Sequence, residues 1–450
     1  FAAHGNAYAL AIRNDGLVRA NGYQMKGGRL SLTAGSRGNI INTGGLYARN
    51  ADGSGGRIEV SGDRVEISAG SMDASGDAGR VGGSVAVSGN VVAIGEPAEL
   101  RVGGSRGGEA SISATEAVEM AGSIDASASI GRGGAVDVTA ESVIIGSSAS
   151  IHASGRGGGG ALRIGGGISG KDASLANASS TTVEAGAVLR ADSEGGDGGS
   201  VVVFGQDDTI FSGEISARAL GGLGNGGFVE VSGKRNLLID GTVSTRSANG
   251  RSGTLLIDPV DVTIYSATST DAGTMSDAAL RGFVANNHVI IHTSGESGGS
   301  GIIRVLSGAK VIYDSPNSLA FLAHDSIIID GDIKNIGTTD NNGTGNITLA
   351  AGWDGTLPVG LPNDAGESQS ITGFVEAADF INPDGTPLAT PGRYGTWGGE
   401  NSRILLNSSG QEAVEVGSAR GETNLFAETV QLRHGFAEGR FAQVGYRRVA

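Results

Sequence analysis

The sequence contains no cysteine among its 450 residues, and aromatic side chains make up only 4% of it. A chain without cysteine forms no disulfide and lacks the thiolate ligands of the usual structural zinc sites. With so few aromatics, the core must be built from Val, Ile, Leu and Ala, which favours a narrow stack of aliphatic side chains over a wide globular core. No hydrophobic run approaches the roughly 18 residues of a membrane-spanning helix.

Basic residues are also scarce relative to acidic ones. The 32 Lys and Arg residues stand against 47 Asp and Glu, so the formal net charge is 32 − 47 = −15. A surface of this sign disfavours binding to nucleic acid and to anionic membranes, and it helps to keep a long repeat soluble.

Glycine, in contrast, is abundant and recurs in doublets. It accounts for 81 residues, and the first members of successive doublets are separated by 28, 27, 25, 26 and 25 residues. A period of this length, with alternating strands inside each unit, predicts a β-solenoid. The doublets are Gly27-Gly28, Gly55-Gly56, Gly82-Gly83, Gly107-Gly108, Gly133-Gly134 and Gly158-Gly159.

Each doublet lies between two sequence signatures. A short alternating strand such as RIEVSG (57–62) or AVDVTA (135–140) follows most doublets, and a small-residue strand ending near Ala-Ser-Gly, such as ASIHASG (149–155), precedes most of them. Two or three strands per unit, separated by Gly, Ser, Asn or Asp turns, predict an all-β parallel β-helix with loop excursions.

The repeat divides the chain into four regions. Residues 1–265 carry regular Gly-rich coils, with an excursion near 166–186 where the period breaks. Residues 266–351 continue the β-helix and include one short helix near 276–285, which Ser276 is placed to cap. Residues 352–398 have little alternation, five of the eight prolines and both tryptophans, so we expect a long irregular excursion. Residues 399–450 return to β-helix coils.

Catalytic chemistry has few candidates in this sequence, and we expect no enzyme. The carboxylate pairs Asp207-Asp208, Asp258 with Asp261 and Asp330 with Asp332 resemble those of polysaccharide-cleaving β-helices. Aspartate is also a common turn former at solenoid corners, which is the reading we favour. His288 and His292 share a strand face but are separated by roughly 13 Å, too far for one metal ion to bridge. We therefore predict no cofactor and no metal site.

Several segments in a fixed order resemble large exoproteins of the filamentous haemagglutinin and high-molecular-weight adhesin type, which are exported by two-partner secretion. The segments are YALAIRNDGLVRANG (8–22), GGRLSLTA (27–34), RIGGGISG (163–170), NGGFVEVSGK (225–234), SGTLLIDPVDVTI (252–264), SDAALRGFVANNHVIIHT (276–293) and RFAQVGYR (440–447). The resemblance covers nearly the whole chain.

The resemblance implies a right-handed parallel β-helix that is secreted or held at the bacterial cell surface and mediates adhesion. It implies two partners, an outer-membrane transporter and host-cell glycans or proteins. The secretion domain that such a transporter recognises does not match any segment of the chain, which starts inside a repeat, so we expect a fragment truncated at both ends. Three alternatives stay open: a passive stalk of a contact-dependent inhibition toxin, a haem-carrier-binding exoprotein and a polysaccharide-processing enzyme.

Ligand contacts are expected on the excursions, because loops on a rigid scaffold carry specificity. Trp353, Tyr394 and Trp397 are candidates for stacking on sugar rings, although we favour a role for them as a plug over the side of the solenoid. Sequons at Asn177, Asn342, Asn346 and Asn407 are candidate glycosylation sites. Asn, Ser and Thr are so frequent here that chance alone produces several such matches.

Overall fold

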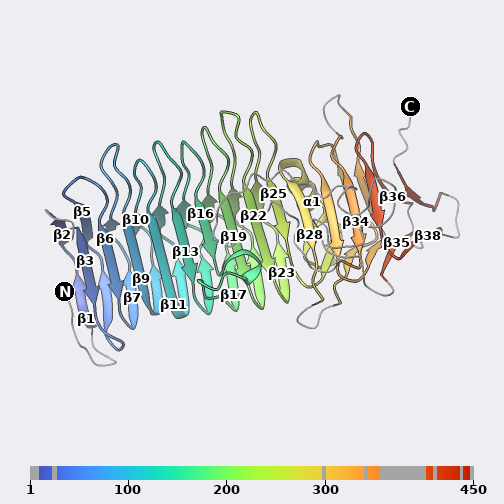
Figure 1. The fold of residues 1–450 in the computed structure, drawn as a ribbon. Helices are drawn as coiled ribbons and strands as arrows, with labels where there is room; N and C mark the ends of the chain where they lie inside the picture. Colours follow the sequence, from blue (N-terminus) through green and yellow to red (C-terminus); the bar gives the residue numbers. More distant parts are fainter. Residues whose placement is uncertain are drawn as a thin grey trace. The chain divides into compact units, whose positions relative to one another are not determined.

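The computed structural model describes residues 10–22, 28–295, 300–338, 343–353, 402–408, 413–435 and 439–445. The chain is almost all β, with 49% strand and one α-helix in the described part, and its parallel sheets stack as a β-solenoid of about 13 turns (Figure 1). The predicted fold class is therefore confirmed. Two compact units are present: the described residues up to Val229 form the first together with Ser244–Gly253, and Glu230–Val243 form the second together with the described residues from Thr254 onward.

In the first unit, each coil contributes two strand segments to a first sheet and one to a second sheet. The first sheet contains β1 (Leu10–Asn14), β3 (Arg29–Thr33), β4 (Asn39–Asn42), β6 (Arg57–Ser61), β7 (Arg64–Ile67), β9 (Ser84–Ile94), β11 (Glu109–Met120), β13 (Ala135–Thr139), β14 (Ser142–Ile145), β16 (Ala161–Ile164), β17 (Ser180–Val183), β19 (Ser200–Gly205) and β20 (Asp208–Phe211). The second contains β2 (Leu17–Gly22), β5 (Gly45–Asn50), β8 (Ser71–Asp73), β10 (Glu99–Arg101), β12 (Ser123–Asp125), β15 (Ser150–His152), β18 (Val188–Arg190) and β21 (Glu214–Ser216).

Aliphatic residues stack in register through the core of this unit. In the second sheet, Leu100 pairs with Ile124, Ile124 with Ile151, and Ile151 with Leu189. All four are at most 1% exposed. Full burial of such a side chain stabilises a fold by about 1.5–3 kcal/mol. The inward positions of each strand therefore hold the coils together, and the period-2 pattern leaves the outward positions free for polar residues.

The glycine doublets mark a position where the backbones of successive coils lie in close contact. A Cβ added at Gly83, Gly108, Gly134 or Gly160 would lie 2.0 Å from the carbonyl oxygen of the equivalent glycine one coil earlier. The N–H of Gly134 also donates to Ala126 O (2.8 Å), the alanine of the small-residue signature in the same coil. The two sequence signatures thus meet at one contact, where only glycine fits.

One doublet differs from the prediction. In the run Gly157–Gly160, the stacked pair is Gly159 and Gly160, since Gly160 lies over Gly134 and the next residue, Ala161, donates to Gly134 O (2.9 Å). The prediction of Gly158-Gly159 was wrong by one residue, because four consecutive glycines hide the register in the sequence.

The second unit repeats the parallel pairing and contains the helix. Strands β22 (Phe228–Gly233) and β24 (Thr242–Ser244) include the unit boundaries. The remaining elements are β23 (Asn236–Ile239), β25 (Thr254–Ile257), β26 (Val262–Tyr265), β27 (Met275–Ser276), α1 (Asp277–Asn286), β28 (His288–His292), β29 (Ile303–Val305), β30 (Lys310–Tyr313), β31 (Leu319–Ala323), β32 (Ile327–Ile329), β33 (Asp332–Asn335), β34 (Ile347–Ala351), β35 (Arg403–Asn407), β36 (Val414–Ser418), β37 (Thr423–Phe426), β38 (Thr429–Arg433) and β39 (Ala442–Val444).

Helix α1 begins where its capping residue predicts. The Ser276 hydroxyl accepts a hydrogen bond from Ala279 N (3.1 Å), and Leu280, Phe283 and Val284 are buried. Beyond β34, the pairing of Ile347 with Thr423 spans 76 residues, against 28 for the preceding pairing of Leu319 with Ile347. The expected excursion at 352–398 falls in this interval, and 354–401 lie outside the described residues.

Candidate functional site

The excursion near 166–186 is a loop between β16 and β17 that packs against the first sheet. The loop occupies the residues between Ile164 and Ser180 and includes the 3-10 turn η1 (Ile168–Gly170). It ends where β17 begins, before the expected boundary at residue 186. Ile168 is 7% exposed. A Cβ at Gly170 would lie 2.4 Å from Cζ of Phe204, which is fully buried on β19. We expected an excursion that protrudes from its coil, but the buried Ile168 and the contact of Gly170 with Phe204 show that the loop folds back over the outer face of the first sheet.

The same loop is fixed by a charged cluster on its inner side. The Arg163 guanidinium donates to both carboxylate oxygens of Asp137 (Nε to Oδ1 2.6 Å, Nη2 to Oδ2 2.9 Å) and to Asp172 of the loop (3.4 Å). The hydrogen bond from the Ser174 hydroxyl lowers the pKa of Asp172, and burial raises that of Asp137. This cluster uses its charges internally, so it anchors the loop and leaves little charge for a ligand.

Of the three aromatic candidates, only Trp353 lies in the described part. The residue is 5% exposed. Its backbone N–H donates to Ala323 O (2.8 Å), and its backbone carbonyl oxygen lies 3.1 Å from His324 Nδ1. A buried side chain suits the plug role that we favoured for Trp353 and does not suit stacking on a sugar ring. Tyr394 and Trp397 lie outside the described residues.

The first two predicted carboxylate pairs have structural partners on neighbouring coils. The backbone N–H groups of Asp207 and Asp208 both donate to Ser179 O of the preceding coil (2.8 and 3.1 Å). The Asp261 carboxylate accepts from the backbone N–H groups of Ser300 and Ile302 (3.1 and 2.8 Å). These contacts join neighbouring coils, so the aspartates of both pairs have structural partners, and the turn role that we favoured for them stays a prediction.

The third pair takes part in contacts between coils. Asp330 accepts from Asn407 Nδ2 (2.7 Å), and Asp332 from Lys334 Nζ (3.1 Å). Burial lowers the pKa of Lys334, but the carboxylates of Glu415 and Asp332 outweigh that effect, so its pKa lies above the usual value. The charges in this group stabilise one another across successive coils.

Asp258 and His292 form a buried pair that the sequence did not indicate. Asp258 Oδ1 lies 2.6 Å from His292 Nδ1, and both side chains are 4% exposed. Asp258 follows β25 and His292 ends β28, two strands that pair in parallel. A carboxylate that orients an imidazole is half of an acid–base site, which also needs a reacting group within hydrogen-bond reach. Within the described residues, His292 Nε2 has no hydrogen-bond partner, so no such group is in place.

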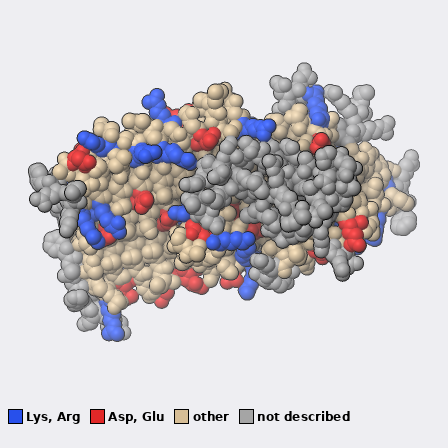
Figure 2. All heavy atoms as spheres, in the orientation of Figure 1, with Lys and Arg blue, Asp and Glu red and all other residues tan. Residues whose placement is uncertain are grey.

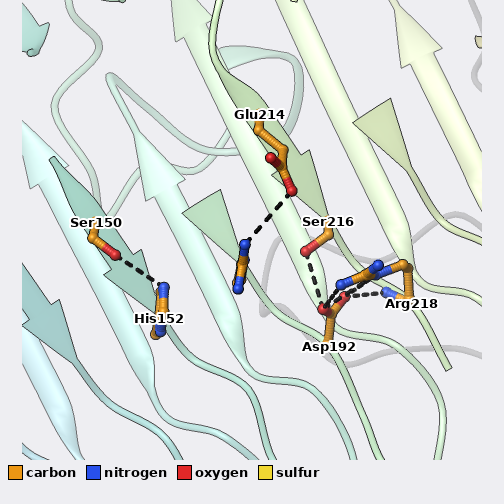
Figure 3. A network of polar contacts seen from close by, with 7 residues as sticks. Ser150, His152, Asp192, Glu214, Ser216 and Arg218 are labelled. Carbon is orange, nitrogen blue, oxygen red and sulfur yellow. Dashed lines mark hydrogen bonds and ion pairs between the residues drawn. The ribbon is translucent and has the colours of Figure 1, made fainter. Parts of the chain in front are cut away.

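A polar network at outward positions of the first unit crosses β15, β18 and β21 of the second sheet (Figure 3). Asp192 lies between Ser216 and Arg218: it accepts from Ser216 Oγ (3.1 Å), Arg218 N (2.7 Å) and Arg218 Nη2 (2.7 Å). The Glu214 carboxylate lies 3.7 Å from Arg190 Nη2. These residues lie at outward positions of consecutive coils, so the stacking alone brings them together.

Two pKa shifts in this network have clear causes. Hydrogen bonds to Asp192 raise the pKa of Arg218 above its ordinary value. Burial, and then the positive charge of Arg190, lowers the pKa of His152, whose Nε2 lies 2.9 Å from Ser150 Oγ. His152 therefore favours its neutral form in the folded protein.

The sequon asparagines in the described part make hydrogen bonds within the protein. Asn177 Nδ2 donates to Gly170 O (2.7 Å), and Asn407 Nδ2 to Asp330 (2.7 Å). The Asn346 side-chain oxygen accepts from Glu422 N (2.8 Å). A glycan would attach to the amide nitrogen, so at Asn177 and Asn407 it would displace an internal hydrogen bond. Asn342 lies outside the described residues.

In the described ranges, no group of three or more His, Cys, Asp or Glu side chains is arranged to hold a metal ion. No helix in that part of the chain is long and apolar enough to cross a membrane. No protein-family model matches the sequence, and no curated protein matches it significantly.

Proposed function

We propose that the chain is a segment of a large secreted or surface-exposed bacterial adhesin that mediates attachment to host cells or to other cells. The observation that carries the proposal is the stacked parallel register, in which outward side chains repeat on every coil at a spacing of about 4.8 Å. A surface built in this way offers many equivalent weak contacts, which add up to strong attachment. The β-solenoid is compatible with this role.

The motif order described above supports the same proposal and supplies its partners. Segments resembling haemagglutinin-like exoproteins occur from YALAIRNDGLVRANG to RFAQVGYR. We propose export through an outer-membrane transporter of two-partner secretion, with host-cell glycans or proteins as receptors. We infer no catalytic step, cofactor or metal for this function.

One observation favours a passive stalk as the second candidate. Several charged side chains satisfy one another, as in Arg163 with Asp137, Arg218 with Asp192 and Lys334 with Glu415. Charges paired in this way stiffen the coils and contribute little to a ligand. A stalk of a contact-dependent toxin would need only this stiffness.

Binding of the labelled full chain to epithelial cells and erythrocytes separates the two candidates. An adhesin segment binds saturably and is displaced by excess unlabelled chain, whereas a stalk does neither. A variant lacking 352–398 then tests whether that region holds the receptor site. Its circular dichroism and hydrogen exchange must match those of the parent chain, so that lost binding is not lost folding.

A further inference from the structure

Four exposed arginines follow one another along one edge of the first unit. Arg80, Arg106, Arg132 and Arg156 lie on consecutive coils, in the glycine-rich turns that lead from the second sheet back to the first. These turns project beyond the strands in a row (Figure 1), and Figure 2 shows patches of Lys and Arg atoms along the same edge with Asp and Glu atoms among them. None of the four forms an ion pair within the described part of the chain.

The backbone places these arginines in a regular row. Arg106 O accepts from Gly82 N (2.9 Å) and Arg132 O from Gly107 N (3.1 Å), so the two residues occupy neighbouring rungs about 4.8 Å apart. A Cβ at Gly131 would lie 2.7 Å from Arg106 Cγ, and one at Gly158 would lie 3.0 Å from Arg132 Cγ. Glycine on the next coil thus leaves room for each arginine stem to lie along the edge.

These turns together form a surface that we call the turn edge, and its charge is opposite to that of the whole chain. The turn edge comprises residues 75–82, 103–107, 127–133, 154–159, 193–198, 219–226 and 246–252. It contains six arginines and three acidic residues, which gives 6 − 3 = +3 against −15 for the chain. One of the acids, Asp77, is already paired with Arg49. The six arginines are Arg80, Arg106, Arg132, Arg156, Arg246 and Arg251.

The same turns expose aliphatic side chains. Leu223 is 87% exposed, Ile130 62%, Leu220 51% and Val81 46%. They are four of the eleven large hydrophobic residues exposed in the described part of the chain. A soluble polyanion such as nucleic acid or an acidic polysaccharide offers guanidinium groups a partner, but it gains little from exposed leucine and isoleucine. A bilayer with anionic headgroups offers partners for both kinds of side chain.

We propose that the turn edge docks on an anionic lipid surface. The guanidinium groups of Arg106 and Arg132 bind headgroup phosphates, and the side chains of Ile130 and Leu223 enter the boundary between headgroups and acyl chains. The edge meets the membrane from outside, without a spanning segment. This inference rests on the proposed attachment function, which it deepens by naming the surface that the chain contacts.

Co-sedimentation of the full chain with phosphatidylcholine vesicles, with and without phosphatidylglycerol, tests this docking. We expect binding only to vesicles that contain phosphatidylglycerol, and weaker binding as salt rises. Arg106→Gln with Arg132→Gln should weaken binding about fivefold per arginine, or about 25-fold together. Ile130→Ser with Leu223→Ser should weaken it as well. The matched control is Arg37→Gln with Arg64→Gln, which removes the same charge from exposed positions off the edge.

The outcomes separate this inference from the proposed function. No binding to anionic vesicles, or equal losses in the Arg106/Arg132 and Arg37/Arg64 variants, would overturn the docking. Binding to dextran sulfate that needs the arginines but not Ile130 and Leu223 would overturn it too, in favour of a polysaccharide partner. A chain that binds anionic vesicles but no cells would retain the docking and refute the adhesin proposal; cell binding without vesicle binding would do the reverse.

Discussion

Substituting one glycine of a stacked doublet should destabilise the solenoid strongly. A methyl group at Gly134 would lie 2.0 Å from Gly108 O, far inside van der Waals contact. That oxygen is held, because it accepts the hydrogen bond from Ala135 N (3.0 Å) that opens the pairing of β11 with β13. Gly134→Ala can therefore be accommodated only by moving backbone that is already hydrogen-bonded on both sides.

The cost of Gly134→Ala follows from these contacts. Overpacking a well-ordered core costs about 1–3 kcal/mol, and losing one backbone hydrogen bond in the core adds about 1 kcal/mol or more. We expect a loss of about 2–4 kcal/mol in the free energy of unfolding. The matched control is Gly95→Ala, whose added Cβ would come no closer than 3.5 Å to its nearest neighbour, Ser68 Cα. We expect Gly95→Ala to be neutral or slightly stabilising, because alanine restricts the unfolded chain.

Hydrogen exchange read coil by coil is the appropriate assay, since long repeat arrays do not unfold in a single two-state step. Gly134→Ala should raise exchange in β11, β13 and β16, whereas Gly95→Ala should leave the protection unchanged. Equal protection in the two variants would refute the explanation of the doublets as steric contacts between coils.

Three further predictions concern single side chains. Asp192→Ala should lower the local stability of β18 and β21 by about 2 kcal/mol in hydrogen exchange, because it leaves Arg218 half-buried without its carboxylate partner, and unchanged protection there would contradict this. His152 has a folded pKa below its unfolded value of 6.5, so its contribution to stability is complete above about pH 6.5 and is lost as pH falls through the folded pKa. His152→Gln should therefore flatten the fall in denaturation midpoint below pH 6.5, and an unchanged slope would refute this. Phe204→Ala should cost about 3–5 kcal/mol and expose the loop between β16 and β17 to limited proteolysis, which an intact loop would contradict.

The parts of the fold that repeat were predictable from sequence. The glycine period and the alternating strands predict the solenoid, because each coil repeats the same inward positions. Ser276 predicts the start of α1, since its hydroxyl caps the first turn. The register of the four glycines at 157–160 was not predictable, because any adjacent two of them fit the pattern.

Contacts between coils were the main features that sequence reasoning missed. Asp258 and His292 are 34 residues apart, and neither lies in a recognisable motif. Phe204 occupies an outward position of β19, where alternation predicts exposure, and it is buried because Gly170 of the preceding loop reaches it. The network around Asp192 was missed for the same reason, because its members look like ordinary outward polar residues until the coils are stacked. Aligning outward positions by the doublet period would have indicated the network, but not the loop contact.

Retention of coated beads on an epithelial monolayer under flow tests the proposed attachment most directly. Beads coupled to the full chain should stay bound at flow rates that remove albumin-coated beads, and free chain should release them. Retention no better than albumin, by chain whose hydrogen exchange shows protected coils, would contradict the adhesin account.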